Sequence, residues 1–241
     1  MKKNFHLHAG RYVLQPIYQN NLENILGVNQ KISVAVVGAT HDEIEYQLLK
    51  EMEVVERVEF FGISTEENYL DLNEDFSTKY RGLKYKYDLV ICCQVLEHVW
   101  NHSIAIMNLA NLIKDGGYIW CNTPSSNLKH GSPYYFFAGI QSETLEKLFS
   151  LFGVITIERG EVGSRRLYSM THEQQYWPSF LVHQKPWLRG FENRRYLFPF
   201  KFLKYSMKSF RALFWSRKFE RESQWATETF FFGKKLPTSF R

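Results

Sequence analysis

Polar side chains follow an apolar run in the stretch YDLVICCQVLEHVWNH, residues 87–102. The apolar run ends at Cys93, and Gln94, Glu97 and His98 come directly after it. In an open parallel sheet, ligands bind outside the carboxyl ends of the strands, and a histidine placed there can take a proton from a reacting group. Cys93 and Gln94 are therefore candidates for lining a ligand crevice, and His98 is a candidate general base.

A second histidine, His130, lies in the stretch NLKHGSPYYFF, residues 127–137, after a predicted strand. A general base must reach the proton of the acceptor and titrate near the working pH, and histidine meets both conditions. The competing interpretation is a surface histidine stacked among the neighbouring aromatic rings. We place His130 before His98 as the candidate base.

The stretch SVAVVGATHDE, residues 33–43, indicates a buried strand that enters a ligand loop at Gly38. A loop that binds a pyrophosphate needs further glycines, so that backbone N–H groups can approach the phosphates. Thr40 and Asp42 occupy those places here. Carboxylates beside a helix N-terminus would repel a dinucleotide, which argues against NAD or FAD.

Short apolar runs alternate with helical patterns up to about residue 160, which predicts βαβ units and a mostly parallel sheet. Ser142 is the expected N-cap of the last helix in this part, and Gly153 is expected to end that helix. We expect strands at 33–37, 58–63, 69–72, 88–92, 118–121, 154–158 and 226–235, and helices at 42–53, 102–114 and 142–152.

The charge of the chain changes near residue 160. Residues 1–160 contain 14 Lys and Arg against 19 Asp and Glu, whereas residues 161–241 contain 16 against 6 and hold 20 of the 40 aromatic rings. For an insertion at 161–225, three interpretations are open. Its rings pack on the core and its lysines are solvated, or it binds an anionic membrane surface or acceptor, or it stacks on nucleic acid. We expect no nucleic-acid partner, because no recognisable binding motif accompanies the charge.

The composition is that of a globular chain, with 241 residues, 44% hydrophobic and 23% charged. Residues 1–16 lack the apolar segment of a signal peptide, and no stretch approaches the roughly 20 apolar residues of a spanning helix. Cys92, Cys93 and Cys121 are odd in number, which suits buried free thiols in a reducing compartment. We therefore expect a cytoplasmic protein, membrane-peripheral if the basic insertion binds lipid.

Together these segments resemble the class I S-adenosylmethionine-dependent methyltransferases of the small, Rossmann-like type. The pattern of that family is an aromatic–Asp pair, a buried strand, xxVLEHV, a helix, LLKPGG and a strand ending in TP. The corresponding letters here are YD, LVICCQVLEHV, LIKDGG and CNTP. Residues 134–158 resemble the segment before the sixth strand of the family, and residues 226–235 resemble its antiparallel seventh strand.

The resemblance implies an α/β fold with a Rossmann-like, doubly wound, mostly parallel sheet and an antiparallel last strand. Residues 1–30 would be an N-terminal flanking segment. Residues 31–160 plus 226–235 would form the methyltransferase-like core. Residues 161–225 would be an aromatic and basic insertion that acts as a lid or a surface-binding element.

The resemblance also implies S-adenosylmethionine as the cofactor. By position, the cofactor crevice would be formed by Gly38, Ser64, Asp71, Cys93 and Gln94. The sequence departs from the family at two acidic places, which are Val36 and Ser64 here. Because S-adenosylmethionine carries a sulfonium and no phosphate, the need for further glycines relaxes.

The expected activity is methyl transfer to an oxygen or nitrogen of a small-molecule or glycan-type acceptor, with His130 or His98 as the base. Some RNA methyltransferases have a motif that resembles QVLEH, residues 94–98, and bind a metal through a Glu at the place of Gln94. A neutral amide is a poor ligand for a hard cation, so we expect no metal. Two alternatives remain, a scaffold that has lost catalysis and a peripheral membrane protein.

Overall fold

The computed structural model describes residues 9–25, 31–38, 44–63, 68–75, 80–127, 133–163, 168, 220–221 and 225–237. Its elements are α1 (Ala9–Ile25), β1 (Ile32–Val37), α2 (Ile44–Glu51), β2 (Val55–Phe61), η1 (Arg81–Leu83), β3 (Tyr87–Cys93), η2 (Leu96–His98), α4 (His102–Leu112), β4 (Ile113–Pro124), α5 (Ser142–Ser150), β5 (Val154–Gly163), β6 (Glu220–Arg221) and β7 (Ala226–Lys235). None of the helices described is long and apolar enough to cross a membrane.

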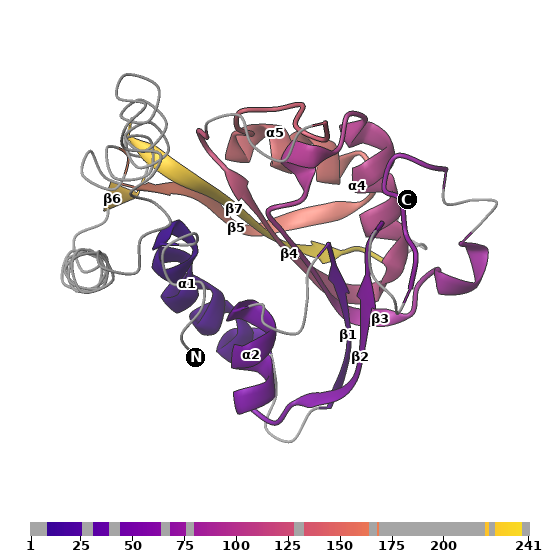
Figure 1. Ribbon diagram of the computed structural model, residues 1–241. Helices are drawn as coiled ribbons and strands as arrows, with labels where there is room; N and C mark the ends of the chain where they lie inside the picture. Colours follow the sequence, from indigo (N-terminus) through magenta and orange to yellow (C-terminus); the bar gives the residue numbers. More distant parts are fainter. Residues whose placement is uncertain are drawn as a thin grey trace, which may run out of the picture.

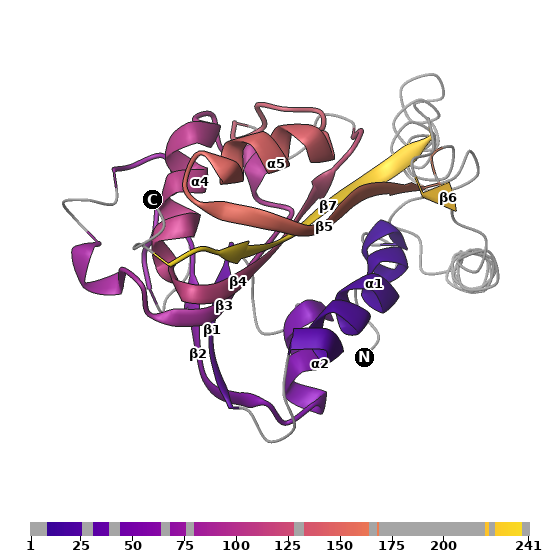
Figure 2. The ribbon, with the colours of Figure 1, turned by 180° about the vertical axis from the view of Figure 1, so that it is seen from behind.

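Seven strands form one sheet in the order β2-β1-β3-β4-β7-β5-β6. Strands β1 to β4 pair in parallel, and β7 lies antiparallel between β4 and β5. Helices α1 and α2 lie on one side of this sheet and α4 and α5 on the other (Figures 1 and 2). The predicted α/β fold, with its mostly parallel sheet and antiparallel last strand, is confirmed.

Alternating side chains of strands β1 to β4 and β7 enter two separate cores, because successive residues of a strand point to opposite faces. On β7, Phe231 packs in the core beneath α4 and α5, whereas Phe230 and Phe232 pack in the core beneath α1 and α2. All three rings are fully buried. We call the two sides of the sheet the α4 face and the α1 face.

Helix α1 belongs to the packed structure, although no helix was predicted before residue 33. Leu14, Tyr18 and Leu22 recur every fourth residue, which places them on one helix face, and all three are buried on the α1 face. The Tyr18 ring lies 4.9 Å from that of Trp120, and its hydroxyl donates to the main-chain oxygen of Glu45 at 3.2 Å. Residues 9–25 therefore cover part of the sheet.

Some predicted bounds differ from the structure. The expected strand at 69–72 is reduced to one parallel bridge between Gly62 and Tyr69. Strand β5 continues to Gly163, so the boundary expected at residue 160 falls inside it, and its end pairs with β6. Of the insertion, the structure describes only Tyr168, β6, Trp225 and the end of β5.

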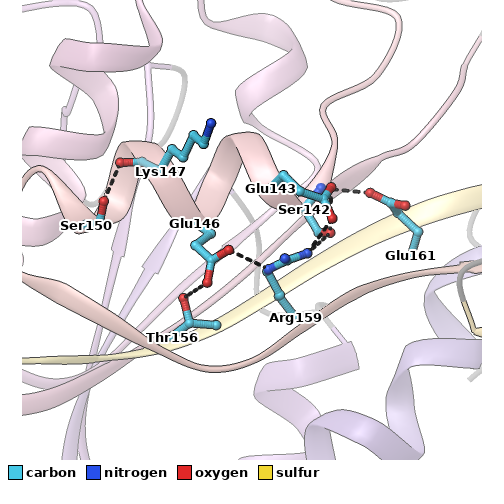
Figure 3. Close-up of polar contacts among 8 residues, drawn as sticks. All are labelled: Ser142, Glu143, Glu146, Lys147, Ser150, Thr156, Arg159 and Glu161. Atoms are coloured by element: carbon cyan, nitrogen blue, oxygen red, sulfur yellow. Dashed lines mark hydrogen bonds and ion pairs between the residues drawn. The ribbon is translucent and has the colours of Figure 1, made fainter.

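Helix α5 is fixed to β5 by ion pairs and hydrogen bonds (Figure 3). The Arg159 guanidinium donates to Glu146 at 2.8 Å and to Glu143 at 2.6 Å. The N-cap is Gln141, so the prediction of Ser142 was wrong by one residue. The Ser142 main-chain N–H donates instead to the Glu161 carboxylate at 2.8 Å, which satisfies an amide of the first helical turn. The predicted end is confirmed by the left-handed φ of Gly153, +73°.

Candidate active site

The carboxyl ends of β1 and β3 adjoin, since Val37 pairs with Cys92. Gly38 follows β1 with a left-handed φ of +77°, and its N–H donates to the main-chain oxygen of Phe61 at 2.6 Å. A Cβ on Gly38 would lie 2.2 Å from Cγ2 of Val95. This position therefore requires glycine twice, for its backbone angle and for the close approach of the chain that leaves β3.

Gln94 follows β3 and also has a left-handed backbone, with φ of +57°. In a residue other than glycine this conformation costs about 1 kcal/mol or more, and such strain concentrates at functional sites. The main-chain N–H donates to the main-chain oxygen of Asn122 at 2.9 Å. The side-chain Nε2 donates to the Glu228 carboxylate at 2.9 Å, so Gln94 joins the ends of β3, β4 and β7.

Asn122 lies between these strands, with Cys93 as its partner on β3 and Phe230 as its partner on β7. Its side chain is 0% exposed, and neither the nitrogen nor the oxygen of its amide has a hydrogen-bond partner. A buried polar group left in this state costs about 1–3 kcal/mol. Among natural proteins such groups are few, and a ligand that completes the hydrogen bonds is one explanation.

The turn η2, which follows β3, carries two further polar side chains. Glu97 is fully buried, and its main-chain oxygen accepts from the amides of Phe136 and Phe137 at 3.0 and 3.3 Å. Nδ1 of His98 lies within hydrogen-bond distance of the main-chain oxygen of Tyr134. Its Nε2 lies 3.9 Å from the Glu97 carboxylate, and its side chain is 28% exposed. His98 is thus held by main chain at one nitrogen and faces a carboxylate with the other.

Two other titratable groups near η2 are structural. Nε2 of His102 lies 2.9 Å from the main-chain oxygen of Leu96, and the ring packs on Phe137 at 4.1 Å between centroids. Burial lowers the pKa of His102, although the contact with Leu96 opposes that shift. The hydrogen bond to Cys121, together with burial, raises the pKa of Cys92 well above its usual value. The expectation of buried free thiols is confirmed.

Asp71 is bound by a near neighbour. Its carboxylate accepts from the main-chain and side-chain nitrogens of Asn73, at 2.9 and 3.0 Å. The side-chain oxygen of Asn73 in turn accepts from the main-chain nitrogens of Trp100 and Asn101, at 3.2 and 3.3 Å. These contacts connect the loop after β2 to the start of α4.

The structure thus brings together three of the predicted cofactor residues, Gly38, Cys93 and Gln94, at the ends of β1 and β3. Asp71 lies beyond β2, and His98 lies on η2. The other two predicted residues, Ser64 and His130, lie outside the described residues. Sequence reasoning missed Asn122 and Glu228. In the sequence, each of the two is marked only as a polar residue near one end of an apolar strand.

A hollow of about 140 Å³ lies at the opposite, amino-terminal edge of the sheet, with Ile25, Asp88 and Gly117 in its lining. Burial opposes ionisation of Asp88, but hydrogen bonds from Ser33 and Lys114 outweigh it and lower the pKa of the carboxyl. The hollow is distant from the left-handed turns at Gly38 and Gln94, so we place the site at the carboxyl edge.

The Gly38→Ala substitution is expected to destabilise the fold strongly, by about 2–4 kcal/mol in the free energy of unfolding. Gly116 is a matched control, because it has a similar φ of +79° with open space around the missing Cβ. The Gly116→Ala substitution should therefore cost only about 1 kcal/mol. Urea unfolding of both variants checks this. Equal losses would show that the contact with Val95 does not constrain the site.

The lowered pKa of His102 predicts a loss of stability in mild acid. The unfolded chain takes up a proton near its ordinary pKa of about 6.5, whereas the folded state resists protonation to lower pH. The free energy of unfolding should therefore fall as pH decreases below this value. In a His102→Gln variant the fall between pH 7.5 and pH 5.5 should be smaller, whereas identical pH dependence would contradict the assignment.

Comparison with known proteins adds to this geometry. The model of a family described as a methyltransferase domain matches residues 41–224. A ubiquinone biosynthesis O-methyltransferase of Vibrio parahaemolyticus is 32% identical over 117 residues, which cover 48% of this chain and 46% of that protein. One of Shewanella pealeana is 36% identical over 76 residues, or 31% of each chain. The matches thus span less than half of the length of these curated relatives.

Solved structures of low identity share the fold. A putative sarcosine dimethylglycine methyltransferase of Galdieria sulphuraria aligns with a TM-score of 0.54 at 10% identity, covering 95% of this chain and 86% of that one. The CurJ carbon methyltransferase aligns with a TM-score of 0.52 at 12% identity, covering 97% of this chain and 57% of that one. The family model covers most of the chain. The protein therefore belongs to the methyltransferase-domain family and has the fold of the class I S-adenosylmethionine-dependent methyltransferases.

Proposed function

We propose that the protein transfers a methyl group from S-adenosylmethionine to an oxygen of a small-molecule acceptor. The observation that carries the proposal is the pair of left-handed turns, at Gly38 and Gln94, where the carboxyl ends of β1 and β3 adjoin. That place is where open α/β sheets bind ligands. The O-methyltransferase names of the curated relatives favour an oxygen over a nitrogen. A glycan-type acceptor remains one form of the proposal.

The described residues fit the cofactor. The side chains near this edge include carboxylates and amides, among them Asp71, Gln94 and Glu97. Such groups suit a ligand that has a positive charge and no phosphate. Gly38, Asp71, Cys93 and Gln94 would hold the cofactor, and Ser64 remains a further prediction. When bound, S-adenosylmethionine supplies an electrophilic methyl group.

The chain must align the acceptor and remove its proton. His98 is arranged for the second task. A hydrogen on Nδ1 would donate to the main-chain oxygen of Tyr134, which leaves the lone pair on Nε2. A proton taken at Nε2 would be stabilised by the buried Glu97 carboxylate 3.9 Å away. His130 remains the first candidate from the sequence.

Residues 161–225 are proposed as a lid over the acceptor. Both ends of the insertion support this placement, because β5 and β6 pair at its root through Val162 and Gly163. The 16 basic residues among residues 161–241 would suit an anionic membrane surface. Deletion of residues 169–219 would remove this segment while keeping the residues of β5, β6 and β7. Co-sedimentation with anionic vesicles, with and without this segment, tests the membrane form.

Calorimetric titration with S-adenosylmethionine and S-adenosylhomocysteine tests the proposed function directly. We expect dissociation constants in the micromolar range, as is common for enzyme ligands. The Gly116→Ala variant, altered at the opposite edge, should bind equally well. If the wild-type protein shows no heat of binding at millimolar ligand, the chain has lost its cofactor and a scaffold role replaces the proposal.

The choice of base is tested by His130→Ala and His98→Ala. Loss of a general base should lower the rate of methyl transfer by about 10²–10⁴-fold while leaving the affinity for S-adenosylhomocysteine intact. We expect this result for one of the two variants and near wild-type turnover for the other. Turnover on a panel of small phenols and sugars, measured by product mass, is the readout. Two unaffected variants would exclude both histidines.

A further inference from the structure

The unpaired amide of Asn122 is next to two polar side chains on the same face of the sheet. Asn122 lies two residues after Trp120, and Glu228 lies two residues before Phe230. Because Trp120 and Phe230 both pack on the α1 face, Asn122 and Glu228 point to that face as well. The side chain of Gln94 reaches the same place, since its Nε2 donates to the Glu228 carboxylate at 2.9 Å.

The antiparallel direction of β7 brings Glu228 to this edge. Glu228 pairs with Pro124, the last residue of β4, and with Val162 near the end of β5. Asn122 in turn pairs with Cys93, the last residue of β3. Gln94, Asn122 and Glu228 thus lie near the ends of three neighbouring strands.

We propose that Asn122 and Glu228, beside the cofactor residue Gln94, form the acceptor subsite, and that this subsite takes an uncharged acceptor through its hydroxyl groups. The inference rests on the proposed function. A hydroxyl both donates and accepts hydrogen bonds, as does an amide. One hydroxyl of the acceptor can therefore donate to Oδ1 of Asn122, and a neighbouring hydroxyl can accept from Nδ2. The Glu228 carboxylate disfavours an anionic group at the same place.

Asn122 orients the acceptor, since an amide does not titrate and cannot take the proton. Glu228 acts as a positioning residue through Gln94, because the hydrogen bond to Glu228 fixes one N–H of the Gln94 amide. Sugars and phenols both offer the required hydroxyl groups. The two sources share this chemistry, and the experiment separates them.

A matched pair of buried asparagines distinguishes a binding role from a packing role. The amide of Asn108 is also fully buried, but its Nδ2 donates to the main-chain oxygens of Leu72 and Glu74, at 3.0 and 2.7 Å. We expect Asn108→Leu to lower the thermal midpoint of the ligand-free protein. Asn122→Leu should raise it, because an unpaired buried amide is replaced by an apolar side chain of similar size. A gain in stability excludes unfolding as the cause of lost binding.

The binding arms use wild type, Asn122→Leu and Glu228→Gln, each saturated with S-adenosylhomocysteine. The probes are catechol, methyl glucoside, and 3,4-dihydroxybenzoate as the anionic analogue of catechol, detected by saturation-transfer NMR. Wild type should bind catechol or methyl glucoside, and whichever binds identifies the source. Asn122→Leu should lose about tenfold or more in affinity for that probe, with unchanged affinity for S-adenosylhomocysteine. Glu228→Gln should improve binding of 3,4-dihydroxybenzoate relative to catechol.

Each failure has a distinct meaning. Absence of S-adenosylhomocysteine binding in wild type would contradict the proposed function itself. Intact cofactor binding with no binding of either uncharged probe, or with 3,4-dihydroxybenzoate bound best by wild type, would overturn the uncharged class. Acceptor binding unchanged in Asn122→Leu would overturn the subsite. If Asn122→Leu does not fold, Asn122→Ala gives the same comparison, because it also removes the amide.

Discussion

The pairing of β7 with both β4 and β5 determines the arrangement of the rest of the molecule. Strand β7 forms antiparallel hydrogen bonds with β4 on one side and β5 on the other, and without it these two strands would not be joined. The three consecutive phenylalanines at 230–232 anchor it from both faces, since alternate rings enter different cores. Because β5 carries α5 through the contacts of Arg159 and Glu161, the position of β7 also fixes that helix. A single antiparallel strand therefore links β5, and with it α5, to the parallel half of the sheet.

The same geometry explains why the carboxyl edge can carry strain. The parallel strands β1 and β3 are almost entirely buried, and the turns that follow them have a left-handed backbone at Gly38 and Gln94. The cost of the left-handed backbone at Gln94 and of the unpaired Asn122 amide is offset by extensive apolar burial elsewhere. A site that is costly without ligand becomes favourable when a ligand completes its hydrogen bonds. Strain and unmet hydrogen bonds at one edge thus agree with a binding site there.

The sequence predicted the central strands well and the edges poorly. The apolar runs at β1 and β3 are buried on both faces, so their pattern has no competing interpretation. Helix α1 was missed although Leu14, Tyr18 and Leu22 recur every fourth residue, because Pro16 and a run of polar residues interrupt that signal. The strand expected at 69–72 has alternating character, but only Tyr69 forms a bridge. Edge strands depend on neighbours that local sequence does not specify.

In the candidate site, too, residues with a local sequence pattern were predicted and residues placed by long-range pairing were missed. Gly38 and Gln94 were found because each directly follows an apolar strand, a local signal. Glu228 is 134 residues from Gln94, and only antiparallel pairing brings the two side chains together. A motif of further glycines is also unnecessary at β1. The chain after β3 approaches Gly38 itself, and this contact alone forbids a side chain there. The degenerate loop thus keeps the one glycine that packing requires and loses those that a phosphate would require.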